Sequence, residues 1–213
     1  ILRTHVEQLG NMGVDLTIVD GALSRLSLAS PTVTDAMVLA TGAAVSANVK
    51  QLVSKTKFLY NLICLDAVEP ALRERLNPIQ SGLWGIDDDG IPHDLGISSV
   101  FLIDRVETSL LHFGHTLFAS GAVSDRLLRL LTTKAEGITL ITRDFTKLFI
   151  TPEAYVEFAR RNNRILVLQR SRLIAVTLNP TSPQGFLLDS KSTCSALSEA
   201  LQMPVYDVMQ IDQ

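Results

Sequence analysis

The chain is poor in cysteine, in aromatic residues and in charge of one sign. Its 213 residues include two cysteines, and 19 lysines and arginines stand against 22 acidic residues, which gives a net charge of -3. This balance offers no broad basic surface, so we expect no nucleic-acid partner. Cys64 and Cys194 lack the short spacings of zinc ligands or of a disulfide framework, which favours a reducing, cytoplasmic compartment.

Long apolar runs are also missing. A membrane-spanning helix needs about 20 consecutive apolar residues, and polar residues interrupt every apolar run of this sequence well before that length. We therefore expect no membrane span. Hydrophobic residues nevertheless make up 46% of the chain and charged residues 19%, a composition that supports a packed core and excludes disorder caused by excess charge.

Several signature motifs of well-known enzyme classes do not occur. The sequence has no Gly-x-Ser-x-Gly nucleophile turn, no Gly-x-Gly-x-x-Gly dinucleotide motif and no Gly-x-x-x-x-Gly-Lys-Ser/Thr phosphate loop. Residue 1 is Ile rather than Met. We therefore expect the chain to be a C-terminal fragment of a longer protein, with a phosphate loop in the upstream part, and we expect this fragment alone to be inactive.

Five short runs rich in Val, Ile and Leu are each followed by turn-forming residues, as is typical of buried parallel strands. The predicted strands are Val14 to Val19, Ala36 to Ala40, Ile138 to Ile141, Ile165 to Leu168 and Leu173 to Leu178. Helical spacing of apolar residues and capping signals predict helices between them, over Leu2 to Leu9, Val45 to Ile63, Ser124 to Leu131, Thr151 to Arg161 and Ser190 or Ser192 to Leu201. The alternation predicts a single α/β domain over residues 1–213, with a mostly parallel layered sheet and helices on both faces.

Residues 78–121 interrupt this alternation. Asp87 to Gly90 separate two apolar runs, and Asp-Gly between such runs predicts a hairpin. Val100 to Ile103 and His115 to Phe118 are further candidate strands. We interpret residues 78–121 as a small β-containing insertion or subdomain at the edge of the main sheet.

Polar residues that follow predicted strands are the candidate site, because ligands of open parallel sheets bind beyond the carboxyl ends of the strands. Asp20, Gly21, Ser24 and Arg25 come directly after the first predicted strand. In the functional interpretation, Asp20 is a catalytic residue that holds Mg²⁺ or its water. In the structural interpretation, the same residues make a tight turn that Asp20 caps.

Three other strand ends carry candidate ligand-binding residues. Thr41 precedes a predicted helix whose free amides suit an anion, although the sequence favours structural capping over anion binding at this position. Arg143 and Asp144 would bring a cation and a carboxylate to the same edge of the sheet. Asn179 begins a proline-rich loop in which its amide can read a base or an organic substrate, or in which it only stabilises a rigid turn.

Two groups of residues resemble a known family. The first covers residues 16–25 (LTIVDGALSR), 27–31, Asp35 and 40–44, and the second covers 175–180 (AVTLNP), 182–185 and 204–208 (PVYDV). Together they are similar to the reactivating subunit of adenosylcobalamin-dependent lysine aminomutase, a family whose longer members contain a phosphate loop. The resemblance spans most of the chain.

The resemblance implies a nucleotide-dependent accessory protein that helps to exchange damaged cobalamin on an adenosylcobalamin-dependent aminomutase. It further implies that ATP and Mg²⁺ are the cofactors of the full-length protein, with Asp20, Ser24, Arg25 and Asn179 on the nucleotide side. The residues themselves leave a second hypothesis open. In it, the polar strand ends form a non-catalytic small-molecule-binding or regulatory domain.

Overall fold

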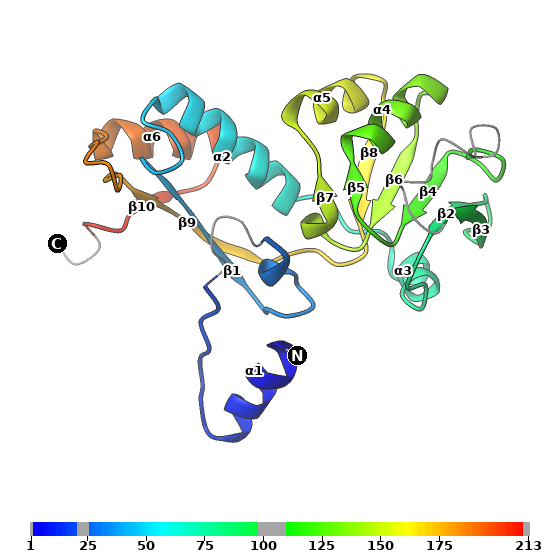
Figure 1. Cartoon of the computed structure of the whole chain (residues 1–213), viewed down its shortest axis with the longest axis horizontal. Coiled ribbons are helices and arrows are strands. Elements are labelled where there is room, and N and C mark those ends of the chain that lie inside the picture. The colour runs from blue at the N-terminus through cyan, green and yellow to red at the C-terminus, as the bar shows by residue number, and fades with distance from the viewer. Residues whose placement is uncertain (1, 21–25, 98–109, 211–213) are drawn as a thin grey trace. The chain divides into compact units, whose positions relative to one another are not determined.

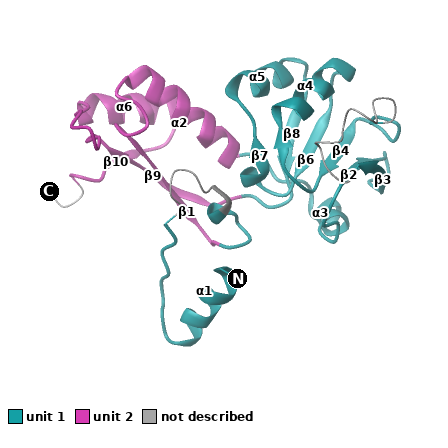
Figure 2. Cartoon of the chain, in the orientation of Figure 1, with its two compact units in different colours: residues 1–33, 65–170 teal, residues 34–64, 171–213 magenta. Residues whose placement is uncertain are grey.

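The computed structural model describes residues 2–20, 26–97 and 110–210. The chain divides into two compact units, each with its own sheet (Figure 2). Unit 1 comprises residues 1–33 and 65–170, and unit 2 comprises residues 34–64 and 171–213. The α/β class predicted from the sequence is confirmed, but the strands form three sheets, of which two have three or more strands, where the sequence pattern predicted one sheet.

Unit 1 contains a five-stranded mixed sheet with the strand order β3-β2-β4-β6-β8 (Figure 1). Strands β4, β6 and β8 run parallel to one another, whereas β2 is antiparallel to both of its neighbours. The strands are β2 (Leu83–Ile86), β3 (Pro92–Ile97), β4 (Thr116–Ala119), β6 (Thr139–Thr142) and β8 (Arg164–Val167). The strands predicted over residues 138–141 and 165–168 correspond to β6 and β8, each within one residue.

Helices cover both faces of this sheet. Helix α3 (Pro70–Leu76) places Leu76 in a buried cluster with Ile86, Phe118 and Ile141 of the sheet. Because successive side chains of a strand point to opposite faces, Leu117 and Leu140 face the other side. Helices α4 (Asp125–Lys134) and α5 (Pro152–Arg160) pack there.

The remaining elements of unit 1 are short or lie at its surface. They are α1 (Leu2–Asn11), the 3-10 helices η1 (Leu26–Ala29) and η3 (Phe145–Lys147), and a two-stranded parallel ladder of β5 (Val123–Ser124) and β7 (Leu148–Phe149). Helix α1 has no buried residue. Among the helices of the described residues, none combines the length and apolar character that crossing a bilayer requires.

Unit 2 is a three-stranded parallel sheet in the order β1-β9-β10, with two helices on one face (Figure 1). Its elements are β1 (Met37–Gly42), α2 (Val49–Ile63), β9 (Leu173–Asn179), α6 (Ser190–Leu201) and β10 (Val205–Asp207). The buried positions Leu39, Val176 and Leu178 alternate with more exposed ones along β1 and β9. This alternation aims the apolar side chains at α2 and α6, as the predicted amphipathic helices require.

The strand predicted over Val14 to Val19 is wrong. Residues 14–19 belong to no helix or strand, and Leu16 and Ile18 are 76% and 84% exposed. The apolar run is long enough for a strand, but a strand forms only where a neighbouring edge pairs with its backbone groups. Asp20 therefore does not stand at the carboxyl end of a strand.

The hairpin predicted at Asp87 to Gly90 is confirmed, because it joins the antiparallel strands β2 and β3. Residues 78–121, interpreted above as an insertion, supply three of the five strands of the unit 1 sheet, since β4 pairs with both β2 and β6. The candidate strand at Val100 to Ile103 lies outside the described residues.

Asp87 organises the hairpin. Its Oδ1 accepts hydrogen bonds from the backbone amides of Asp89 and Ile91, and its Oδ2 lies 2.7 Å from Nε2 of His93. The His93 ring stacks on Phe113, with ring centres 4.1 Å apart. The hydrogen bond from His93, the amide of Ile91 and the charge of His93 lower the pKa of Asp87.

We predict that Gly42→Ala destabilises unit 2. A Cβ atom at residue 42 would lie 2.0 Å from the carbonyl oxygen of Asn179, so the backbones of β1 and β9 would have to separate. We expect a loss of about 1–3 kcal/mol in the free energy of unfolding and faster hydrogen exchange in β1 and β9. Gly121→Ala is the control, since no atom lies within 4 Å of its added Cβ. Equal stability of the two variants would contradict the tight pairing.

We also predict that the β2-β3 hairpin loses stability in acid. Because the folded pKa of Asp87 is lowered, its contribution is present above the ordinary pKa of about 4 and is lost as the pH falls through the lowered value. Urea unfolding followed by fluorescence of Trp84, on β2, should therefore show a gap between wild type and Asp87→Asn that closes below about pH 4. Asp88→Asn, an exposed neighbour, should show no such gap.

Candidate functional site

The three strands of unit 2 bring polar groups to one edge. In the parallel register of β1 and β9, Thr41 is aligned with Leu178 and Gly42 with Asn179. Strand β10 ends at Asp207, which is also aligned with Leu178. The carboxyl ends of the three strands therefore meet, and this edge is where parallel sheets place ligands.

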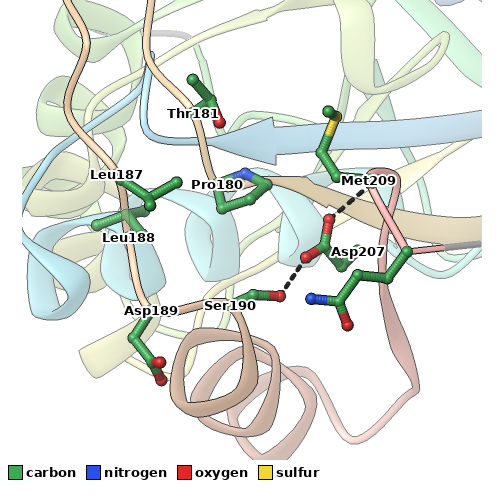
Figure 3. A pocket seen from close by; sticks show the side chains of 9 residues that line it. Pro180, Thr181, Leu187, Leu188, Asp189, Ser190, Asp207 and Met209 are labelled. Carbon is green, nitrogen blue, oxygen red and sulfur yellow. Dashed lines mark hydrogen bonds between the residues drawn. The ribbon is translucent and has the colours of Figure 1, made fainter.

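A pocket lies beyond the ends of β9 and β10, at the N-terminal end of α6 (Figure 3). Its cavity of about 450 Å³ falls within the range of about 300–1,000 Å³ that small-molecule sites occupy. All of the lining residues belong to unit 2: Pro180, Thr181, Leu187, Leu188, Asp189, Ser190, Asp207, Met209 and Gln210. The lining combines apolar side chains with carboxylates, hydroxyls and an amide.

Asp207 is the central polar group of this pocket. It is 9% exposed and lies on the face of the sheet that the helices cover. Its Oδ1 accepts a hydrogen bond of 2.8 Å from the amide of Met209, and its Oδ2 accepts one from the hydroxyl of Ser190 (Figure 3). The positive end of the α6 dipole, which begins at Ser190, favours a carboxylate at this position.

The pocket wall formed by residues 180–188 is held by its own hydrogen bonds. The amide of Leu188 donates to the carbonyl of Pro180 (2.9 Å), and Thr181 and Leu187 form an antiparallel bridge. Ser182 is buried, and its hydroxyl accepts from the amide of Phe186 (2.9 Å). These bonds fix the loop that presents Pro180, Leu187 and Leu188 to the cavity.

Two of the predicted site residues share this edge. Asn179 is exposed, and its Oδ1 accepts a hydrogen bond of 3.0 Å from the amide of Thr181, which leaves its NH₂ group without an acceptor among the described residues. Thr41 is buried, and its hydroxyl oxygen lies 2.7 Å from that of Thr56 on α2. Asn48, not Thr41, caps α2. Asn179 thus faces outward and Thr41 inward.

Arg143 and Asp144 lie in unit 1, after β6, and not on the sheet that carries Asn179. Asp144 is 2% exposed and accepts hydrogen bonds from the hydroxyl of Ser30 (2.8 Å) and from the amide of Thr146 (2.8 Å). The guanidinium of Arg143 donates to the carbonyl of Ile79. The expectation that they join Asn179 at the edge of a single sheet is therefore wrong, because two separate sheets contain these strands.

Of the candidate residues Asp20, Gly21, Ser24 and Arg25, the structure describes Asp20 alone. Asp20 belongs to unit 1 and is exposed, while Gly21, Ser24 and Arg25 lie outside the described residues. Among residues 2–20, 26–97 and 110–210, no cluster of three or more acidic, histidine or cysteine side chains suits a metal ion. A single carboxylate is nevertheless compatible with Mg²⁺, which commonly keeps several waters and takes its remaining ligands from phosphates.

Sequence reasoning missed Asp207, the most deeply placed polar group of the pocket. The signal is weak, because β10 has three residues and is preceded by Pro204. In the sequence, a strand of three residues that ends in Asp cannot be distinguished from an ordinary turn. No protein family, curated protein or solved structure matches this chain, so the geometry of the pocket carries the functional interpretation.

Cys194 lies one helical turn after Ser190 on α6, and the pKa of its thiol responds to the charge of Asp207 in the pocket. Burial and then the negative charge of Asp207 raise the pKa of its thiol, while a hydrogen bond with Ser190 opposes the shift. Since the thiolate is the reactive form, Cys194 is held in its less reactive state.

We predict that Asp207→Asn accelerates alkylation of Cys194 at pH 8. Removing the charge removes one of the two causes that raise the thiol pKa, so the pH profile of iodoacetamide labelling, followed by mass spectrometry, should move to lower pH. The labelling rate of Cys64 in the same samples controls for general loosening of the fold. An unchanged profile at Cys194 would show that the Asp207 charge does not reach the thiol.

Proposed function

We propose that this chain is part of a cytoplasmic, nucleotide-dependent accessory protein that acts on an adenosylcobalamin-dependent aminomutase. The supporting observation is the pocket at the carboxyl edge of the unit 2 sheet, beside Asn179. Parallel sheets bind nucleotides at this edge. The motif residues 175–180 and 204–208, which suggested the aminomutase family, form the strand ends that border the pocket.

We assign the base of the nucleotide to the pocket of unit 2. None of the residues that line its pocket is a lysine, arginine or histidine, whereas Asp189 and Asp207 are acidic. Such a lining suits a base and disfavours phosphate groups. The phosphates would then need cationic groups or a metal ion other than the residues of this lining.

A second candidate function follows from the same lining. Because no lysine, arginine or histidine lines the pocket and all of its lining belongs to one unit, it is also suited to a metabolite without phosphates. In that case the chain is a non-catalytic small-molecule-binding or regulatory domain. The two functions differ in their response to ATP and to the aminomutase.

We predict that the 213-residue chain, which has no phosphate loop, binds ATP only weakly in the presence of Mg²⁺ and that Asn179→Asp weakens this binding further. Aspartate keeps the oxygen that accepts from Thr181 but lacks the NH₂ donors, so the turn is preserved. Calorimetric titration should show an affinity loss of about two- to tenfold, the equivalent of one hydrogen bond. Immobilised lysine aminomutase should retain the chain more tightly with ATP than without it.

The results of these two binding measurements distinguish the accessory function from the small-molecule-binding function. ATP binding that depends on Asn179, together with nucleotide-dependent binding of the aminomutase, supports the accessory function. If ATP does not bind and the aminomutase is not retained, the accessory function is excluded. Binding of a phosphate-free ligand in that situation would favour the small-molecule-binding domain. Ser81→Ala, an exposed position in unit 1, is the control for nonspecific effects.

A further inference from the structure

The polar groups of the unit 2 pocket define which hydrogen-bonding edge a ligand must present. Asp207 is a carboxylate and can only accept hydrogen bonds, with about four lone-pair positions on its two oxygens. Two of these positions are used, by the amide of Met209 and the hydroxyl of Ser190. The remaining ones are available to a ligand that donates N–H groups. A ligand carbonyl or phosphate oxygen at the same place would meet a negative charge instead.

The second acidic residue of the lining does not compete for this role. The Oδ1 of Asp189 accepts a hydrogen bond of 2.8 Å from the amide of Ser192 and so caps α6. Figure 3 shows its carboxylate directed away from Asp207. The hydroxyl and backbone amide of Ser192 lower the pKa of Asp189. Asp207 is therefore the acceptor that a ligand meets inside the pocket.

The rest of the lining suits a flat apolar ring. Pro180, Leu187 and Leu188 come from the loop after β9, and Met209 comes from the turn after β10. Leu187 is 75% exposed and Met209 is 62% exposed, so both have apolar surface that a ring can cover. Gln210, which also lines the cavity, carries NH₂ donors on its amide. The lining therefore offers an acceptor, a donor and apolar walls.

We propose that this pocket binds the adenine ring, with Asp207 accepting a hydrogen bond from the exocyclic amino group. Adenine presents an amino donor at position 6 beside a ring-nitrogen acceptor at position 1, and these match the carboxylate of Asp207 and the amide of Gln210. Apolar side chains pack on the faces of bases in other base-binding pockets. The inference rests on the proposed nucleotide-dependent function and specifies the base that the site reads.

The test compares three nucleosides that differ only at position 6 of the purine. Adenosine has the amino group, purine riboside has hydrogen, and N6,N6-dimethyladenosine has methyl groups in place of both donors. Because hydrogen bonds to charged groups are the strong ones, we expect calorimetry or NMR titration to show adenosine binding at least about tenfold more tightly than either analogue. This comparison needs no variant protein.

A variant then assigns the preference to Asp207. Asp207→Asn replaces the charged acceptor by an amide, which is a weaker acceptor, so the preference for adenosine over purine riboside should fall severalfold. Asp88→Asn, which makes the same chemical change at an exposed position of unit 1, should keep the full preference. The circular dichroism of each variant establishes that it is folded.

The possible results distinguish this inference from the proposed function. Equal affinity for the three nucleosides, in a chain that binds ATP through Asn179, overturns the role of Asp207 and leaves nucleotide dependence intact. A preference for adenosine that depends on Asp207, without any effect of ATP on aminomutase binding, keeps the adenine site and removes the accessory function. If no nucleoside binds, the adenine site is wrong, whatever effect ATP has on binding of the aminomutase.

Discussion

The parallel pairing of β1 and β9 at residues 42 and 179 is the constraint on which the candidate site depends. Gly42 permits a contact in which a Cβ atom would lie 2.0 Å from the carbonyl oxygen of Asn179, and the amide of Ala43 donates to that same oxygen. This pairing fixes the register of β9, and β10 pairs with the other edge of β9. Asn179 and Asp207 consequently reach the same edge, although 28 positions separate them in the chain.

Most elements of the fold could be predicted because their signals are local. Thr151 followed by Pro152 marks the start of α5, and the structure shows the Thr151 hydroxyl accepting from the amide of Ala154. The strand predicted over Val14 to Val19 is wrong because strand pairing depends on tertiary contacts, and a local apolar run carries no information about them. The same limit explains the division into units. Strands β8 and β9 lie close together in the sequence, yet they belong to different sheets.

The candidate site was predicted only in part, for a related reason. Composition and turn chemistry identify polar residues after strands, but they do not show whether the interior of the protein already uses those groups. The carboxylate of Asp144 already accepts hydrogen bonds from the hydroxyl of Ser30, which lies 114 positions earlier in the chain, and from the amide of Thr146. Asn179 uses only its side-chain oxygen within the loop, as the acceptor of a hydrogen bond from the amide of Thr181. Such partners become visible only when the distant segment is in place.

The N-terminal end of α6 explains why the pocket of unit 2 is poorly suited to phosphates. Free amides at the start of a helix ordinarily attract an anion, but here Asp189 accepts from one of them and the carboxylate of Asp207 occupies the adjoining space. A phosphate would add its charge to two carboxylates at a position that contains no lysine or arginine among the lining residues. A ligand of this pocket would therefore draw its affinity from apolar packing and from the hydrogen bonds that it donates.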